Sequence, residues 1–160
     1  REIQDMSYLV MSGSLPSGVS PNLYGQLILA GKNKGAFTFL DTDGNTLQEP
    51  LDYQPAAIKQ NIFELSRLIG RPMRHDAEIL EACGEIHQRG IAYVLVSMGK
   101  EGMILSTPED KIKAVTPPVA VESVVGAGDS AVAGFVLAAC WIGVYVLLFS
   151  MAPGPRIVSL

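Results

Sequence analysis

The sequence lacks any basic run, and its 12 lysine and arginine residues are outnumbered by 16 aspartate and glutamate residues, for a formal net charge of −4. A nucleic-acid backbone is therefore not the expected partner. The chain has two cysteines, Cys83 and Cys140, and no CxxC pair, which favours a reducing, cytoplasmic setting over a disulfide scaffold. The first eleven residues do not have the layout of a signal peptide.

Charged residues are also missing between Ala131 and Ala152, a run that meets the usual length criterion for a membrane span. A membrane-anchored protein is therefore one interpretation. The glycine-rich turn directly before the run disfavours it, because a binding turn beside a lipid span would have no sheet to complete it. With 160 residues, 48% of them hydrophobic, one compact domain is the default expectation, and no membrane partner is expected.

What the sequence does contain is an alternation of apolar runs of strand length with segments of helical periodicity. Strands are expected at 8–11, 36–40, 56–59 and 91–97, with a further pair at 103–106 and 112–115. Helices are expected at 21–34, 61–69 and 76–90, and residues 47–55 are expected to be irregular. This order predicts an α/β fold with a mostly parallel sheet and helices on both faces. Ligands of such sheets bind outside the carboxyl ends of the strands.

The strongest local signal is Gly126-Ala127-Gly128-Asp129-Ser130, which leads directly into a long helical segment. A turn of this kind lets successive N–H groups converge, and the positive end of the helix dipole lies at the same point, so it predicts an anion hole. Asp129 beside it could accept the proton of an attacking hydroxyl while the amides stabilise a phosphoryl group in transit. The alternative is an ordinary helix start with Asp129 as its cap.

Four motifs together resemble the ribokinase-like, PfkB-type carbohydrate kinases. Residues 126–130 are similar to the family's GAGD signature, and Asn61-Ile62-Phe63-Glu64 matches its NxxE motif. Residues 96–102 match its strand and nucleotide-binding turn, and residues 12–16 are similar to a segment of the phosphofructokinase and tagatose-6-phosphate kinase branch. The motifs occur in the family's order between Tyr8 and Ala139, so chance similarity is a poor explanation.

The resemblance implies a role for each motif residue. Asp129 would be the catalytic base, and the amides of Gly126, Ala127 and Gly128 would form the anion hole. Glu64 would position Mg²⁺ through water. The residues implied to bind ATP are Lys59, Asn61, Ser97, Gly99 and Gly102. The residues implied to lie at the sugar phosphate are Ser12, Gly13, Ser14 and Asp41. For an isolated charge such as Lys59, a solvated surface is the competing interpretation.

The implied fold is a ribokinase-like, three-layer αβα arrangement that is truncated at both ends, because family members are about twice as long. Residues 1–140 would form part of the kinase domain, and residues 141–160 would be an atypical tail. One departure concerns the segment before the NxxE motif. The family commonly has Lys-Pro-Asn there, whereas this chain has Lys59-Gln60-Asn61 and so loses the rigidity of the proline.

The implied activity is transfer of the γ-phosphoryl group of ATP, with Mg²⁺, to a hydroxyl of a phosphorylated ketohexose. Fructose 6-phosphate is the first choice of acceptor, and fructose 1-phosphate and tagatose 6-phosphate compete with it. A kinase for an unphosphorylated sugar or a nucleoside is a further alternative. The chain by itself could also be a non-catalytic fragment, because positioning and water exclusion supply much of the catalysis. Kinases of this group often form homodimers, so the full-length form could do so.

Overall fold

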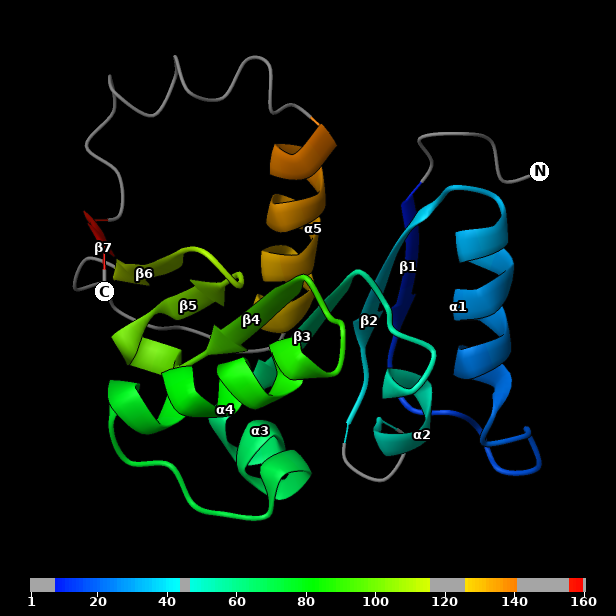
Figure 1. Ribbon diagram of the computed structural model, residues 1–160, viewed down its shortest axis with the longest axis horizontal. Helices are drawn as coiled ribbons and strands as arrows, with labels where there is room; N and C mark the ends of the chain where they lie inside the picture. The colour runs from blue at the N-terminus through cyan, green and yellow to red at the C-terminus, as the bar shows by residue number, and fades with distance from the viewer. Residues whose placement is uncertain (1–7, 44–46, 116–125, 141–155, 160) are drawn as a thin grey trace.

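The computed structural model describes residues 8–43, 47–115, 126–140 and 156–159 (Figure 1). The strands are β1 (Tyr8–Ser12), β2 (Phe37–Asp41), β3 (Ala57–Asn61), β4 (Tyr93–Ser97), β5 (Met103–Ser106), β6 (Lys111–Val115) and β7 (Arg156–Ser159). The helices are α1 (Leu23–Asn33), α2 (Gln48–Leu51), α3 (Ile62–Ile69), α4 (Asp76–Gln88) and α5 (Ala127–Cys140), with a short 3-10 helix η2 (Gly99–Glu101).

The strands form one mixed sheet in the order β1-β2-β3-β4-β5-β6-β7. The first four strands are parallel, and β5, β6 and β7 extend the sheet by antiparallel pairing. Each parallel connection steps in the same direction along the sheet, so right-handed crossovers place their helices on one face. Helix α5 lies on the opposite face (Figure 1). The predicted parallel strands with helices on both faces are therefore confirmed.

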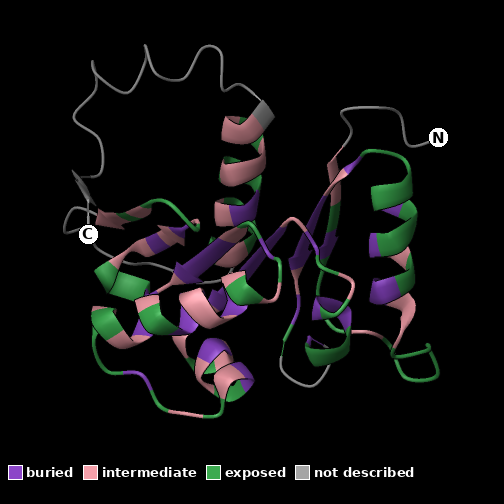
Figure 2. Cartoon of the chain, viewed as in Figure 1, coloured by how far each residue is buried: buried purple, intermediate pink, exposed green. Residues whose placement is uncertain are grey.

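The apolar residues form a core on each side of the sheet. The larger core lies between the sheet and helices α1 to α4 and includes Ile28, Leu40, Ile58, Leu65 and Ile86, each fully buried. The smaller core lies under α5. It joins Phe39, Ala57 and Leu95 of the sheet to Val132 of the helix, with the Phe135 ring against Phe37, Phe39 and Tyr93. Buried positions accordingly concentrate in the middle strands (Figure 2).

Most predicted elements are confirmed, with shifts at their ends. Helix α1 begins at Leu23 and its N-cap is Asn22, so the predicted start at Pro21 after Ser20 is wrong. The reason is a turn in which the Leu23 amide donates to the Ser20 carbonyl. Helix α2 lies within residues that the sequence predicted to be irregular. It has only four residues, too few to show an apolar periodicity.

The uncharged segment 131–152 begins as part of α5, and residues 141–155 lie outside the described residues. Within the predicted tail, β7 pairs with β6. Among the helices that the structure describes, none combines the length and the apolar character needed to cross a membrane.

Candidate active site

Polar residues predicted to share a site lie at the carboxyl ends of adjacent parallel strands. Ser12 at the end of β1 is in register with Asp41 at the end of β2, and Asn61 at the end of β3 is in register with Ser97 at the end of β4. Parallel strands place equivalent ends at the same edge of the sheet, so these four residues lie at one edge, where ligands of such sheets bind.

A buried ion pair joins β2 and β3 at this edge. The Lys59 ammonium lies 3.2 Å from Oδ1 and 3.5 Å from Oδ2 of Asp41. The side chains are only 10% and 12% exposed, respectively. Charges buried to this extent are stable when paired, and here each compensates the other. The solvated surface position considered for Lys59 is therefore wrong, because the pairing with Asp41 holds the ammonium inside the site.

The same ammonium lies against the start of α5. A Cβ atom added to Gly128 would be 2.9 Å from Lys59 Nζ, so the ammonium lies close against the backbone of this glycine. Gly126 has φ +79°, which favours glycine, and its carbonyl accepts from the Ser130 amide at 2.9 Å. The first N–H groups of a helix have no acceptor within the helix. A cation and the positive end of α5 therefore meet at one point, which is the geometry of an anion site.

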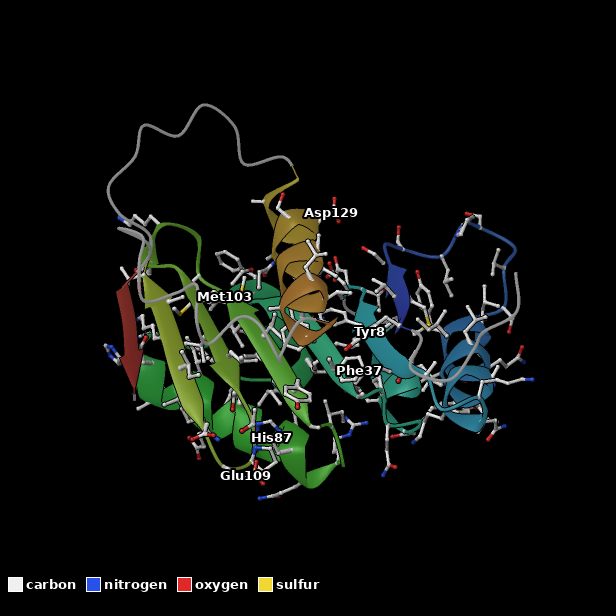
Figure 3. All side chains as sticks on the ribbon, turned by 90° about the horizontal axis from the view of Figure 1, so that it is seen from above. Tyr8, Phe37, His87, Met103, Glu109 and Asp129 are labelled. Carbon is white, nitrogen blue, oxygen red and sulfur yellow. The ribbon has the colours of Figure 1, made fainter. Side chains whose placement is uncertain are left out.

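Asp129 and Ser12 line one cavity between β1 and α5. The cavity has a volume of about 470 Å³, and its walls also include Val10, Val132 and Val136. Asp129 lies in the first turn of α5 (Figure 3), and its side chain is exposed. Because it lines the cavity, a ligand bound there could contact its carboxylate. The structure thus brings the predicted base and the first residue of the predicted sugar-phosphate loop to the same space.

The loop after β1 is held in place by hydrogen bonds to its backbone. The Gly13 carbonyl accepts from the Tyr24 hydroxyl at 2.7 Å and from the Thr42 hydroxyl at 2.8 Å, while the Gly13 amide donates to the Asp41 carbonyl at 2.9 Å. Burial, and secondly the charge of Asp41, raises the pKa of Tyr24, so its hydroxyl stays a donor. Ser14 is exposed beside this anchored glycine.

Tyr24 and Thr42 belong to this site, although sequence reasoning missed both. A tyrosine on the apolar side of a helix is indistinguishable in sequence from a core residue. Thr42 follows a strand end and is typical of a turn. Only the hydrogen bonds to Gly13 distinguish these two residues from core and turn positions.

The NxxE motif forms a capping box at the start of α3. Asn61 Oδ1 accepts from the Glu64 amide at 2.9 Å, and Glu64 Oε2 accepts from the Asn61 amide at 2.7 Å. These bonds satisfy two helix N–H groups and explain the spacing of the motif without a ligand. Glu64 Oε1 makes no hydrogen bond within the described ranges. The predicted roles of Asn61 at ATP and of Glu64 at Mg²⁺ stay predictions.

The described residues contain no group of three or more His, Cys, Asp or Glu side chains that could hold a metal ion by themselves. Mg²⁺ is commonly held by one or two carboxylates, several waters and the phosphates of a substrate. Glu64, with one carboxylate oxygen unused by the capping box, fits that kind of site and not a cage made of protein ligands alone.

The turn after β4 is closed by its own backbone. The Met98 amide donates to the Gly102 carbonyl at 2.8 Å, and Ser97 Oγ donates to the Gln60 carbonyl at 3.5 Å. Gly99 has φ +58° and open space around it, whereas Gly102 has φ +93° and lies against the Ala114 carbonyl. The turn lies beside the strand ends that carry the other site residues. The predicted contacts of Ser97, Gly99 and Gly102 with ATP stay predictions.

Comparison with known proteins gives consistent matches. The family model described as pfkB family carbohydrate kinase matches residues 1–140. A 1-phosphofructokinase of Rhodobacter capsulatus is 34% identical over 136 residues, which are 85% of this chain and 43% of that protein. The structure is similar to phosphofructokinase-2 from Escherichia coli in complex with substrates and products, with a TM-score of 0.81 and 35% identity over 86% of this chain and 46% of that one.

A more distant likeness is to ribokinase of Arabidopsis thaliana complexed with ribose and ATP. The TM-score is 0.69 and the identity is 28%, over 81% of this chain and 42% of that one. The chain therefore spans less than half the length of each of these proteins. Its fold corresponds to part of a ribokinase-like kinase.

Proposed function

Because this chain belongs to the pfkB family of carbohydrate kinases, we propose that it carries the phosphoryl-transfer centre of a kinase acting on a phosphorylated ketohexose. The observation that supports this most directly is the convergence of Lys59 and the start of α5 at Gly128, next to the cavity that Asp129 and Ser12 share. An anion site beside an accessible carboxylate is what transfer of a phosphoryl group to a hydroxyl needs.

In the proposed mechanism, Asp129 accepts the proton of the sugar hydroxyl as the oxygen attacks the γ-phosphorus of ATP, and the bond from that phosphorus to the bridging oxygen breaks, so that ADP leaves. The amides of Gly126, Ala127 and Gly128 and the ammonium of Lys59 stabilise the negative charge that the phosphoryl oxygens carry during transfer. When bound, Mg²⁺ would neutralise charge on the ATP phosphates, and Glu64 is the residue that would hold it through water.

The acceptor sugar is proposed from the loop after β1 and from the relatives. Ser12 and Ser14 present exposed hydroxyls around the anchored Gly13 and would bind the phosphate of the sugar. Fructose 6-phosphate is the proposed acceptor, because phosphofructokinase-2 of Escherichia coli has been crystallised in complex with it. Fructose 1-phosphate and tagatose 6-phosphate are the competing acceptors, and the 1-phosphofructokinase relative supports the first of these.

The chain by itself is proposed to bind the nucleotide but to transfer phosphoryl groups slowly. Asp129 is exposed in this chain, and water at the site would compete with the sugar hydroxyl and slow the transfer. The complete kinase is proposed to be a homodimer. Phosphofructokinase-2 of Escherichia coli forms a tetramer in its inhibited form. Light scattering of a complete kinase would measure its oligomeric state.

Calorimetric titration of the purified chain with ADP tests the proposal. We expect binding that Lys59→Met weakens at least tenfold, because the variant removes the cation from the anion site. Arg67→Met is the matched control, since it removes the same charge from an exposed pair in which Arg67 is 59% exposed. No binding by the unchanged chain, or equal weakening by both variants, would contradict the proposed site.

The transfer step is tested by measuring ADP release with ATP, Mg²⁺ and each of the three sugar phosphates. Any turnover should be lost in Asp129→Asn, which keeps the shape of the side chain but cannot accept the proton. Asp110→Asn, at an exposed turn outside the site, is the control and should behave as the unchanged chain does. Turnover that survives Asp129→Asn would rule out its role as the base.

A further inference from the structure

Gln60 occupies the position between Lys59 and Asn61 where a proline is common in the family. Its side chain is fully buried, and Nε2 donates to the Thr42 carbonyl at 3.0 Å and to the Lys59 carbonyl at 2.5 Å. A proline could make neither bond, because its side chain has no donor. The residue therefore does more than leave out a rigid ring: it links β3 to the end of β2.

This hydrogen bond joins β2 and β3 where the backbone pairing between the two strands is short. The ladder between β2 and β3 has two residue pairs and ends at Leu40 and Ile58, whereas β1 and β2 share five pairs and β3 and β4 share five. Asp41 and Lys59, the next residue on each strand, pair through their side chains instead. The bond from Gln60 to the Thr42 carbonyl lies just beyond them and continues the connection of the two strands where the backbone ladder has ended.

Thr42 also connects to the loop after β1 through its side chain. While its carbonyl accepts from Gln60, its hydroxyl donates to the Gly13 carbonyl at 2.8 Å. The Gly13 amide in turn donates to the Asp41 carbonyl, and Tyr24 holds the same glycine from α1. One continuous set of hydrogen bonds therefore ties together the carboxyl ends of β1, β2 and β3.

The orientation of the Gln60 amide is fixed by this set. Nε2 faces two carbonyl oxygens, so rotating the amide would turn Oε1 toward two acceptors. Oε1 is buried and has no hydrogen-bond partner among the described residues. A buried acceptor without a partner is costly. An apolar side chain of the same size would avoid that cost but would leave the Thr42 carbonyl without this donor. A glutamine at this buried position therefore points to a requirement for the donor.

We propose that Gln60 is a positioning residue. By tying the end of β2 to β3, it holds the Lys59–Asp41 pair and the loop of Ser12 to Ser14 in a single arrangement. Its effect on the sheet edge is independent of activity. Its effect on phosphate binding rests on the proposed function.

The test uses the whole chain with Gln60→Met, which keeps the length of the side chain and removes the donor. Ile58→Val is the control, because Ile58 is a fully buried residue of the same strand on the same face and lies outside these hydrogen bonds. Hydrogen exchange of the Gly13 amide is followed by NMR beside that of Val94 in β4, and the affinity for ADP is measured by calorimetry. If Gln60→Met does not fold, Gln60→Asn, shorter by one methylene group, takes its place.

We expect Gln60→Met to speed exchange at Gly13 at least tenfold more than at Val94, and to weaken ADP binding about tenfold. Ile58→Val should change both amides alike. Equal changes at the two amides in Gln60→Met would overturn the proposal, and so would unchanged ADP affinity when the parent chain binds ADP. If the parent binds no ADP, the proposed function fails, and the exchange rates alone decide the role of Gln60.

Discussion

The Lys59–Asp41 ion pair gives a prediction whose size follows from its geometry. At 3.2 Å, two unit charges attract by about 5 kcal/mol for an effective dielectric constant near 20. Removing one partner leaves the other charge uncompensated at about one-tenth exposure, which typically costs about 3–5 kcal/mol. Lys59→Met and Asp41→Asn should each lower the free energy of unfolding by about that amount.

The double variant separates the attraction between the two charges from the cost of burying one charge without its partner. Lys59→Met combined with Asp41→Asn leaves no buried charge, so it should be far more stable than the sum of the single losses predicts. We expect a coupling energy of about 2–4 kcal/mol from urea unfolding at pH 7, less than the full attraction because pairing replaces hydration.

A second ion pair serves as the control for this cycle. Arg67 and Asp43 lie closer, at 2.6 Å, but their side chains are 59% and 56% exposed. The same cycle with Arg67→Met and Asp43→Asn should give a coupling below about 1 kcal/mol. A Lys59–Asp41 coupling as small as the control's would refute the reasoning, because it would mean that water screens the pair and that the ammonium is not held at Gly128.

Three further predictions concern stability, each measured by urea unfolding. Asn61→Ala should cost about 1 kcal/mol, because it deletes the helix cap to the Glu64 amide, and no loss would show that the cap contributes nothing. Gly102→Ala should cost about 3 kcal/mol or more, because φ is +93° and the new methyl would overlap the Ala114 carbonyl; a mild effect would mean that this turn relaxes. Burial raises the pKa of the Cys83 thiol from 9.0 to about 11, so the stability gained from the neutral thiol is present below pH 9 and lost as the pH rises through 11. Between pH 9 and pH 11 the free energy of unfolding of the parent chain should fall by up to about 3 kcal/mol more than that of Cys83→Ala. Parallel pH profiles of the two proteins would contradict this.

Sequence patterns were sufficient to predict those features whose cause lies within a few residues of the chain. Asn61 and Glu64 are three residues apart and form the capping box that ends β3 and begins α3. Asp76 begins α4, and Gly70 ends α3 with φ +81°. The strand ends could be predicted too, because an apolar run followed by a polar residue marks the edge of a parallel sheet. That Ser12 and Asp41 lie in register at one edge is a finding of the structure.

The same patterns did not show which groups several residues contact. Lys59 was predicted to reach nucleotide phosphates, but its ion pair with Asp41 spans 18 residues of sequence and its neighbour Gly128 lies far later in the chain. Gln60 was noticed only as a missing proline. The hydrogen bonds that give it a role lead to Thr42 on another strand, and no pattern within β3 indicates them.

The sequence by itself determined the family, the alternation of strands and helices, and the set of residues at the strand ends. The absence of a basic run is compatible with the proposed phosphate site, because the positive charge proposed for it comes from one lysine and the start of one helix. Which residues touch was decided only by the tertiary structure. The register of parallel strands and the approach of α5 bring together groups that are far apart in the chain, and the short ladder between β2 and β3 leaves their connection to the side chains of Lys59, Asp41 and Gln60.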